Sequence, residues 1–541
     1  MIRIENLSVA FDDLEVVRKV SLKIRDGEIL GVVGESGSGK SVTALTLMGL
    51  ISEDAKITSG KIYYDKTLLL EAGKPKDQEL LRSYQGKRMS MVFQEPMTSL
   101  NPTMKVGAQV EEMLELHDQE KQKSGAGKAE RLSWKKKTEE FQKLREKRKK
   151  LVLDTLQSVG LKDVERVYDC YPHQLSGGMR QRVMIAMAVI LHPGLIVADE
   201  PTTALDVSVQ NQIIDLLKQI NEKQKNSMLF ITHDLNLARR LCDRIVVMQN
   251  GMIVEAGPTE EIFEDPRGEY TQKLINAVPK RENRKETEGA VKEARKPLVE
   301  VRDLNVYYRE NTHALLGKTR RKCVVEGASF QVYEGEILGL VGESGCGKTS
   351  LSKAVLGLNK MTEGSVIHHS NAPQMVFQDP YSSLNPAKTV GWLLKEPLRA
   401  QGMLDTSRAL SESQREEAAY EMLSKIGLSE EYYYRTPDRL SGGQRQRISI
   451  GQALITRPGL VIADEPVSAL DVTIQAQILE LIKNLQRDLG TAFLFISHDI
   501  NVIYQVSDRI MVMRNGKILE IGETLELFHS PRDPYTKELL R

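Results

Sequence analysis

Two glycine-rich segments carry residues that could wrap a phosphate group. Both fit the spacing Gly, four residues, Gly-Lys-Ser/Thr, in which backbone amides and a helix N-terminus bind phosphate. We expect Lys40 and Lys348 to reach the β- and γ-phosphates of a nucleotide, and Ser41 and Thr349 to bind Mg²⁺. The expected nucleotide contacts are Gly34, Ser36, Gly37, Ser38, Gly39, Lys40 and Ser41 in the first segment, and Gly342, Ser344, Gly345, Cys346, Gly347, Lys348 and Thr349 in the second.

Two apolar stretches, 195–200 and 460–465, each end in a pair of acids. The first acid, Asp199 or Asp464, can hold Mg²⁺ or its water. The second, Glu200 or Glu465, can orient or deprotonate an attacking water. Alone, such a strand end is often only a solvated edge. Beside a phosphate loop, the catalytic interpretation is favoured.

The elements around the phosphate segments have the required order. Apolar stretches at 29–33 and 337–341 predict buried strands before the two loops, and 44–48 and 351–355 predict helices after them. The motifs recur in the same order along the chain, which indicates duplicated domains. We expect a first domain at 1–276, a charged linker at 277–297 and a second domain at 298–541.

The first copy contains a basic insertion at 117–150, with thirteen Lys/Arg and six Asp/Glu residues. Its composition is typical of a solvated, charged helix with a loose break. A contact with phospholipid head groups or RNA is the alternative.

Composition places the chain among soluble globular proteins. Its 541 residues are 40% hydrophobic and 28% charged, and its net charge of +1 gives no general attraction to nucleic acid or anionic lipid. No apolar run is long enough to span a bilayer, and the N-terminus lacks a signal core, so we expect membrane contact only through a partner. The four cysteines show neither metal-ligand spacing nor a disulfide framework, which fits a reduced cytosol.

The remaining repeated motifs are Leu-Ser-Gly-Gly, Asp-Glu-Pro, Ala-Leu-Asp and Ser/Thr-His-Asp, each present twice and in this order. This pattern resembles the ATP-binding-cassette (ABC) family over nearly the whole chain. The resemblance implies an α/β fold with two P-loop ABC ATPase domains. Each would have a RecA-like α/β core, an antiparallel β portion and a helical subdomain, the last between Gln94 and Ser176 or between Gln378 and Ser441.

The resemblance also assigns roles by position, and both sites are expected to hydrolyse ATP. The glutamines of the Q-loops would touch Mg²⁺ and the transmembrane partner. The signature residues would cap the γ-phosphate bound by the opposite domain. The histidines would contact the γ-phosphate, and two aromatic residues would stack on adenine. The residues are Gln94 and Gln378 for the Q-loops; Ser176, Gly177, Gly178, Ser441, Gly442 and Gly443 for the signatures; Ala204, Leu205, Asp206, Ala469, Leu470 and Asp471 for the D-loops; His233 and His498 for the switch histidines; and Phe11 and Tyr308 for the aromatics.

Two further features are similar to the dipeptide, oligopeptide and nickel importer ATPases: Phe-Gln-Glu/Asp-Pro with Ser-Leu-Asn-Pro at 93–102 and 377–386, and Tyr-Thr near each domain end. This implies an ATP-hydrolysing subunit with ATP and Mg²⁺ as cofactors, at the cytoplasmic face of the cell membrane. Its partners would be two permease subunits and an extracytoplasmic substrate-binding protein, with no nucleic acid. The alternatives are a soluble tandem ABC protein acting on ribosomes and a carbon–phosphorus lyase accessory ATPase. The sequence does not identify the cargo, because selectivity lies in the partners.

Cys346 stands inside the second phosphate loop, where the first copy has Ser38. Loop amides, a helix N-terminus and Lys348 favour a thiolate, so we expect a lowered pKa. We also expect Cys346 to react with a maleimide faster than Cys170, Cys242 or Cys323, and ATP to slow that reaction.

Overall fold

The computed structural model describes residues 1–12, 14–74, 76–124, 134–203, 205, 207–278, 296–310, 320–343, 345–359, 361–370, 373–468 and 470–540. Four of the expected site residues lie outside this part of the chain: Ala204, Asp206, Ser344 and Ala469. So do 279–295 of the linker and 125–133 of the basic insertion. The chain divides into two compact units, Met1–Asn276 and Ala277–Arg541, called here the first and second domain.

The central sheet of the first domain has the strand order β10-β9-β3-β8-β7-β6. Neighbours from β9 to β6 run parallel, and only β10 pairs antiparallel with β9. Its strands are β3 (Ile29–Val33), β6 (Met89–Val92), β7 (Leu195–Asp199), β8 (Ser227–Thr232), β9 (Arg244–Gln249) and β10 (Met252–Pro258). Strands β3, β7 and β8 are buried along their whole length, which is why their sequences are continuous apolar runs.

A second, antiparallel sheet of the first domain has the order β2-β1-β4-β5. It comprises β1 (Ile2–Phe11), β2 (Leu14–Ile24), β4 (Ala55–Tyr64) and β5 (Thr67–Glu71). One core joins this sheet to the central one, because Ile4 and Val17 belong to the same buried cluster as Val32 and α1 (Lys40–Leu47). The helix α2 (Gln78–Tyr84) adds Leu81 to this core.

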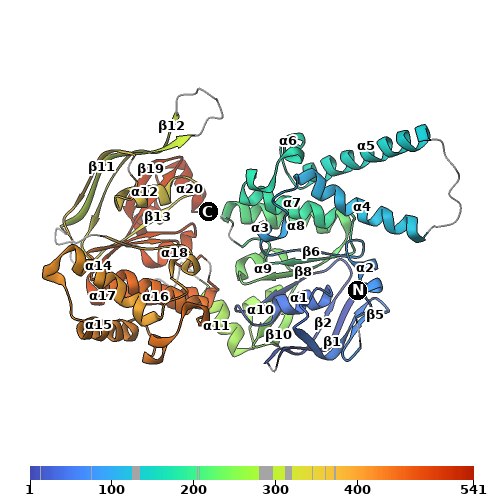
Figure 1. The fold of residues 1–541 in the computed structure, drawn as a ribbon, viewed down its shortest axis with the longest axis horizontal. Coiled ribbons are helices and arrows are strands. Elements are labelled where there is room, and N and C mark those ends of the chain that lie inside the picture. Colours follow the sequence, from blue (N-terminus) through green and yellow to red (C-terminus); the bar gives the residue numbers. More distant parts are fainter. Residues whose placement is uncertain are drawn as a thin grey trace. The chain divides into compact units, whose positions relative to one another are not determined.

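The segment between Gln94 and Ser176 is helical, as the family resemblance implies. It contains α3 (Pro96–Ser99), α4 (Val106–Ser124), α5 (Trp134–Ser158), α6 (Val164–Asp169) and a 3₁₀ turn, Pro172–Gln174. Figure 1 shows α4 and α5 extending well beyond the neighbouring helices of this domain. The helices α7 (Gly177–Val189), α8 (Val207–Gln224), α9 (Leu235–Leu241), α10 (Thr259–Glu264) and α11 (Glu269–Ala277) complete the domain.

The second domain repeats this plan. Its central sheet has the order β15-β16-β17-β13-β18-β19, and its antiparallel sheet the order β12-β11-β14. The strands are β11 (Pro297–Glu310), β12 (Arg320–Tyr333), β13 (Ile337–Val341), β14 (Thr362–His368), β15 (Gln374–Val376), β16 (Leu460–Asp464), β17 (Ala492–Ile496), β18 (Arg509–Arg514) and β19 (Lys517–Glu523).

The helices of the second domain follow the same order as those of the first. Those between Gln378 and Ser441 are α13 (Pro380–Ser383), α14 (Val390–Leu404) and α15 (Glu412–Lys425), joined by short 3₁₀ turns. The others are α12 (Lys348–Val355), α16 (Gly442–Leu454), α17 (Val472–Leu489), α18 (Ile500–Val506), α19 (Thr524–His529) and α20 (Pro534–Leu539). The α/β fold with its antiparallel and helical portions is therefore confirmed in both copies.

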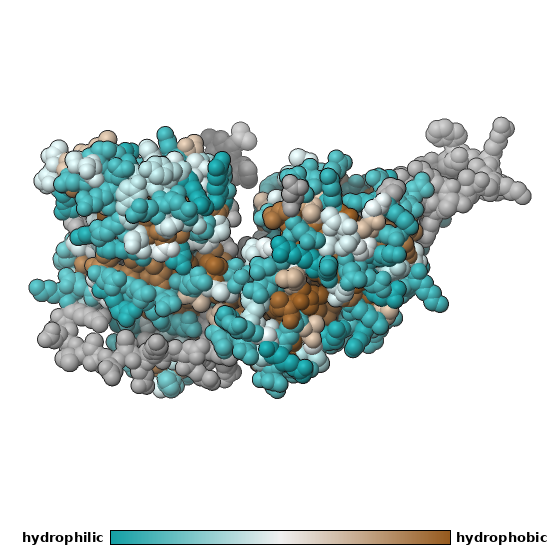
Figure 2. Space-filling model, turned by 90° about the horizontal axis from the view of Figure 1, so that it is seen from below, coloured by the Kyte–Doolittle hydropathy of each residue, from teal (hydrophilic) through white to brown (hydrophobic). Residues whose placement is uncertain are grey.

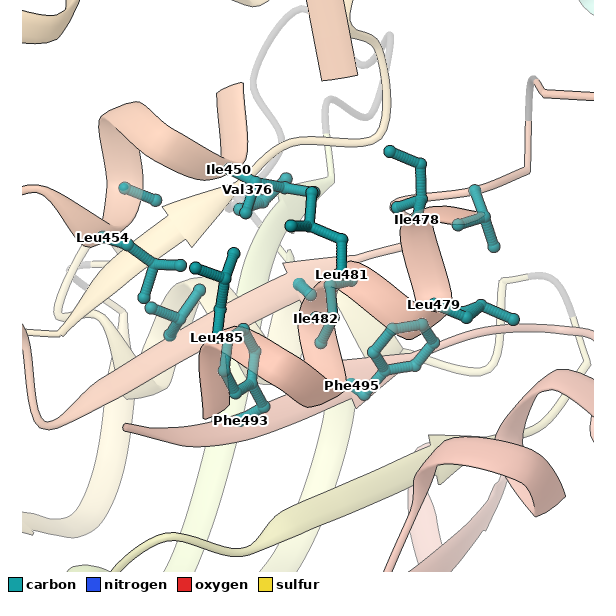
Figure 3. Packing of buried hydrophobic residues seen from close by; sticks show 14 of the residues in the cluster. Val376, Ile450, Leu454, Ile478, Leu479, Leu481, Ile482, Leu485, Phe493 and Phe495 are labelled. Atoms are coloured by element: carbon teal, nitrogen blue, oxygen red, sulfur yellow. The ribbon is translucent and has the colours of Figure 1, made fainter. Parts of the chain in front are cut away.

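Helix packing on the central sheet fixes the strand ends that carry the site. In the second domain, Ile482 and Leu485 of α17 lie with Phe493 of β17 in one buried cluster, as Figure 3 shows. Burial of each such side chain stabilises the fold by about 1.5–3 kcal/mol. The face drawn in Figure 2 is mostly hydrophilic, with smaller hydrophobic patches.

Candidate ATP-binding and hydrolysis sites

Four adjacent parallel strands bring the predicted site residues of the first domain to one edge of the sheet. The phosphate loop follows β3, His233 follows β8, Asp199 ends β7 with Glu200 directly after it, and Gln94 follows β6. In the second domain β13, β17, β16 and β15 deliver the matching residues. Because ligands of open α/β sheets bind beyond the carboxyl ends of the strands, this edge is the expected ligand site.

The glycines of the first phosphate loop are required by close approach and by backbone angle. A Cβ on Gly34 would stand 2.2 Å from the main-chain oxygen of Met248. Gly37 and Gly39 have φ of 78° and 93°, and Gly39 begins α1 as its N-cap. Such positive φ values favour glycine strongly. The loop therefore leads directly into a helix N-terminus, where backbone amides can bind an anion.

Lys40 lies under the loop, with only 5% of its surface exposed. Its Nζ donates hydrogen bonds to the main-chain oxygens of Gly34 (2.8 Å) and Glu35 (2.7 Å). Lys348 makes the same contacts to Gly342 (2.7 Å) and Glu343 (3.0 Å). The ammonium group is thus held at the loop, where a nucleotide phosphate can accept from it in place of a carbonyl.

The next residue of the helix links the loop to the acidic strand end. Ser41 Oγ donates to Asp199 Oδ1 at 3.0 Å. Burial raises the pKa of Asp199 to about 6, although the hydrogen bond from Ser41 opposes this shift. In the second domain burial likewise raises the pKa of Asp464, against a hydrogen bond from Thr349. A hydroxyl and a carboxylate oxygen side by side are the hard oxygen donors that suit Mg²⁺.

Three side chains converge on one carboxylate oxygen of Glu200. Gln94 Nε2 donates to Oε2 at 2.8 Å, Thr203 Oγ1 donates to it at 3.0 Å, and His233 Nδ1 lies 3.2 Å away. Burial raises the pKa of Glu200, but the hydrogen bond and charge of His233 outweigh it, so the pKa lies below its usual value. Burial also lowers the pKa of His233, and its interaction with Glu200 outweighs this, so the net shift is upward.

The second domain repeats this cluster with one difference. Gln378 Nε2 donates to Glu465 Oε2 at 2.9 Å, and His498 Nδ1 lies 3.2 Å from the same oxygen. However, Ser468, the counterpart of Thr203, donates to the main-chain oxygen of Glu465 at 3.1 Å. The carboxylates of Glu200 and Glu465 are therefore positioned by different sets of hydrogen bonds.

The signature serines cap helices. Ser176 accepts from the amide of Met179 at the start of α7, and Ser441 accepts from Gln444 at the start of α16. Gln444 also accepts from the Ser441 amide at 2.9 Å, which completes a capping box. Met179 cannot make this second bond. Gly178 and Gly443 leave room for α8 and α17, because a Cβ would lie 2.7 Å from Val209 or 2.6 Å from Ile474.

The remaining predicted residues lie on the antiparallel sheets and at helix starts. Phe11 ends β1 and is half-buried, and Tyr308 on β11 is 42% exposed. Asp471 is the N-cap of α17 and accepts from Ile474 at 3.0 Å. The structure does not test adenine stacking, which stays a prediction.

The expectation of a lowered pKa for Cys346 is wrong. Its side chain is 5% exposed and belongs to the buried cluster of the second domain, and burial raises the pKa of the thiol although Lys348 opposes this. Cys323 is the exposed cysteine, Cys242 is buried, and Cys170 is intermediate. The sequence argument failed because this loop position points inward, as it does for Ser38, which is 4% exposed.

Sequence reasoning missed two tyrosines at the sites. Tyr270 Oη accepts a hydrogen bond from the amide of Glu35, and Tyr535 Oη accepts one from Glu343, both at 3.2 Å. The signal was present, because Tyr-Thr recurs near the end of each copy. The sequence alone relates this Tyr-Thr pair to the importer group and does not indicate a contact with the phosphate loop.

No group of three or more His, Cys, Asp or Glu side chains is placed to hold a metal ion in the described part of either domain. Any Mg²⁺ at the strand edge would therefore need ligands beyond such side chains. The hydroxyls of Ser41 and Thr349 fit that need, together with nucleotide phosphates.

Comparison with known proteins decides the family. The ABC transporter family matches residues 17–203 and 325–468, together more than half of the chain. The chain belongs to the ABC transporter family. A second family, the C-terminal region of oligopeptide/dipeptide transporters, matches residues 254–303 of this ABC protein.

Curated relatives match over the full length of the chain. The glutathione import ATP-binding protein GsiA of Escherichia coli O157:H7 is 38% identical, covering 100% of this chain and 89% of the relative. GsiA of Salmonella choleraesuis (strain SC-B67) is 37% identical with the same coverage. This ABC protein is thus an ATPase subunit of a peptide-type importer, a class that works with permease components.

Two solved structures share the tandem fold. The RNase-L Inhibitor matches with a TM-score of 0.60 and 22% identity, over 98% of this chain and 95% of its own. The archaeal ribosome recycling factor aABCE1, solved with the ribosomal stalk protein aP1, matches with a TM-score of 0.59 and 22% identity, over 96% and 92%. At this identity the likeness concerns the fold alone. Within the described residues, no helix of this ABC protein combines the length and apolarity needed to cross a membrane.

Proposed function

We propose that this chain hydrolyses Mg-ATP at two composite sites and thereby energises the uptake of short peptides. One observation carries the proposal: both domains bring a phosphate loop, an Asp-Glu pair, a glutamine and a histidine to a single sheet edge. The full-length relatives named for glutathione import support the peptide class of cargo. Nickel-type cargo is the less favoured choice, because the matching C-terminal family is the oligopeptide/dipeptide one.

The residues of each site divide the chemistry among them. Loop amides and Lys40 would bind the nucleotide phosphates, and Ser41, Asp199 and Gln94 would hold Mg²⁺, with Thr349, Asp464 and Gln378 as their counterparts. Bound Mg²⁺ would neutralise phosphate charge. Glu200 and Glu465 would polarise the attacking water, since each is a half-buried carboxylate whose pKa stays below its usual value.

The signature residues support the composite arrangement. Ser176 and Ser441 each begin a helix of thirteen residues whose first positions are glycines, and such a helix start offers amides to a phosphate. In the proposal, Ser176–Gly178 close over ATP bound at Gly342–Thr349, and Ser441–Gly443 close over ATP bound at Gly34–Ser41. Cysteines introduced at Ser38 and Gly442 should therefore cross-link only when ATP is present. Equal cross-linking without nucleotide would count against composite sites.

The proposed partners are two permease subunits and an extracytoplasmic binding protein, which place the chain at the cytoplasmic face of the cell membrane. The test is reconstitution of the full chain with its permease and binding protein in proteoliposomes. ATP should drive uptake of labelled glutathione or a dipeptide. Uptake of Ni²⁺ without peptide uptake would move the cargo to the metal class, and ATP hydrolysis stimulated by ribosomes but not by permease would overturn the import proposal.

A further inference from the structure

A tyrosine from the last helical segment of each domain reaches the start of the phosphate loop. The hydroxyl of Tyr270, on α11, accepts from the main-chain amide of Glu35 at 3.2 Å. The hydroxyl of Tyr535, on α20, accepts from Glu343 at the same distance. These contacts span 235 and 192 residues of sequence, so the fold, not the local chain, brings the groups together.

The peptide group that each tyrosine contacts is bonded on its other side as well. The N–H of Glu35 shares its peptide group with the main-chain oxygen of Gly34, which accepts from Lys40 Nζ at 2.8 Å. In the same way the oxygen of Gly342 accepts from Lys348 at 2.7 Å. If Lys40 turns towards a nucleotide phosphate, the loop loses that internal bond. The bond from the Glu35 amide to Tyr270 then remains to hold the loop in place.

The segment that carries the tyrosine is itself anchored to the central sheet. Glu255, on β10, accepts from the amides of Arg267 (2.9 Å) and Gly268 (3.0 Å), just before α11 begins. Glu520, on β19, accepts from Arg532 (2.9 Å) and Asp533 (3.2 Å) in the second domain. Since these bonds favour the ionised form, they help to keep the pKa of both carboxyl groups below the usual value although burial raises it.

We infer that Tyr270 and Tyr535 are positioning residues that link the C-terminal helix of each domain to its phosphate loop. The path runs from the edge strand, through a glutamate and the helix start, to the tyrosine hydroxyl and the loop. The inference rests on the proposed function in one respect, namely that the loops bind ATP. It predicts that loosening the helix start weakens nucleotide binding at the loop.

Deeper burial of the tyrosine and one further contact make the link tighter in the second domain. Tyr535 is 4% exposed, whereas Tyr270 is half-buried. The guanidinium of Arg514 lies 4.3 Å from the centre of the Tyr535 ring. The residue at the matching position of the first domain is Gln249, which has no cation to offer. Removal of the hydroxyl should therefore disturb the first loop more than the second.

The test measures binding of a non-hydrolysable ATP analogue to the full chain, one site at a time. Lys348→Ala leaves the first site for measurement, and Lys40→Ala leaves the second. In these backgrounds Tyr270→Phe or Tyr535→Phe removes only the hydroxyl. We expect the dissociation constant to rise about three- to tenfold, because the loop amide loses its acceptor. The Tm and the turnover at saturating ATP should stay near the parent values.

The matched control is Tyr84→Phe. Tyr84 lies in α2 with its ring against that of Tyr64 in β4, and removal of its hydroxyl should leave nucleotide affinity unchanged. Glu255→Ala should weaken binding at the first site, and its effect should not add fully to that of Tyr270→Phe, because both lie on one path. Unchanged affinity in both tyrosine variants, or fully additive effects, would overturn the inference. Binding that persists after both lysines are replaced would instead contradict the proposed ATP sites.

Discussion

The hydroxyl of Thr203 donates a 3.0 Å hydrogen bond to Oε2 of Glu200. The matching hydroxyl of the second domain, on Ser468, donates to the main chain of Glu465 instead. Both domains carry the same glutamine and histidine around the glutamate. The two otherwise similar sites therefore differ in this hydroxyl contact. In the first domain the contact is made to the carboxylate of Glu200, which would orient the attacking water.

Replacing Thr203 should affect hydrolysis more than replacing Ser468. Thr203→Val keeps the shape but removes one of three polar neighbours of the Glu200 carboxylate, and a hydrogen bond to a charged group contributes about 1.5–3 kcal/mol. We expect ATP turnover of the full chain to fall a few-fold, with little change in KM. Thr203→Ser should restore most of it. Ser468→Ala is the control, and a loss of turnover equal to that of Thr203→Val would show that the carboxylate contact is unimportant.

Maleimide labelling should follow the exposure of the cysteines. Cys323 is exposed on β12 and should react first, and Cys346 should react slowly because its thiol is buried and its pKa is raised. Peptide mapping after brief labelling, with and without ATP, measures both rates. Cys323→Ser should remove most of the fast labelling. Fast modification of Cys346 in that variant would mean that the loop opens far more than its packing indicates.

A buried acid in the second domain should make stability depend on pH. Burial raises the pKa of Glu336 from 4.5 to about 7, although Arg509, whose Nη1 lies 3.2 Å from Oε1, opposes this. The folded domain thus holds this proton more tightly than the unfolded chain does. Its stabilising contribution is fully present below pH 4.5 and is lost as the pH rises through about 7, by roughly 3 kcal/mol at most.

Glu336→Gln isolates this effect, because the amide keeps the shape of the side chain and does not titrate. The apparent Tm of the full chain should fall less between pH 5 and pH 8 in the variant than in the wild type. The two proteins should be closest in Tm at the acidic end. The same difference in Tm at every pH would mean that this carboxyl group does not ionise in that range.

Much of the site could be predicted because its chemistry depends on residue type at fixed spacing. The phosphate loops needed glycine at positions such as Gly34, where any side chain would meet a main-chain oxygen. Short continuous apolar runs such as 195–198, beside those loops, favour buried parallel strands. The strand order then places the acids, the histidine and the glutamine at one edge without further assumptions.

What could not be predicted depends on which way a side chain points and on contacts distant in sequence. Nothing in the spacing of Cys346 shows that its thiol faces the core rather than the ligand. The bond from Glu35 to Tyr270 joins residues 235 positions apart, so no local pattern encodes it. The different partners of Thr203 and Ser468 also appear only when the turn after each glutamate is seen in three dimensions.

The most direct test of two working ATP sites is the turnover of Glu200→Gln and Glu465→Gln in the full chain assembled with its permease. A neutral amide keeps the shape of each side chain but cannot polarise water. We predict that each substitution lowers ATP hydrolysis at least tenfold while ATP binding persists, and that the double variant hydrolyses none. Wild-type turnover in either single variant would contradict the claim that both domains are catalytic sites of this importer.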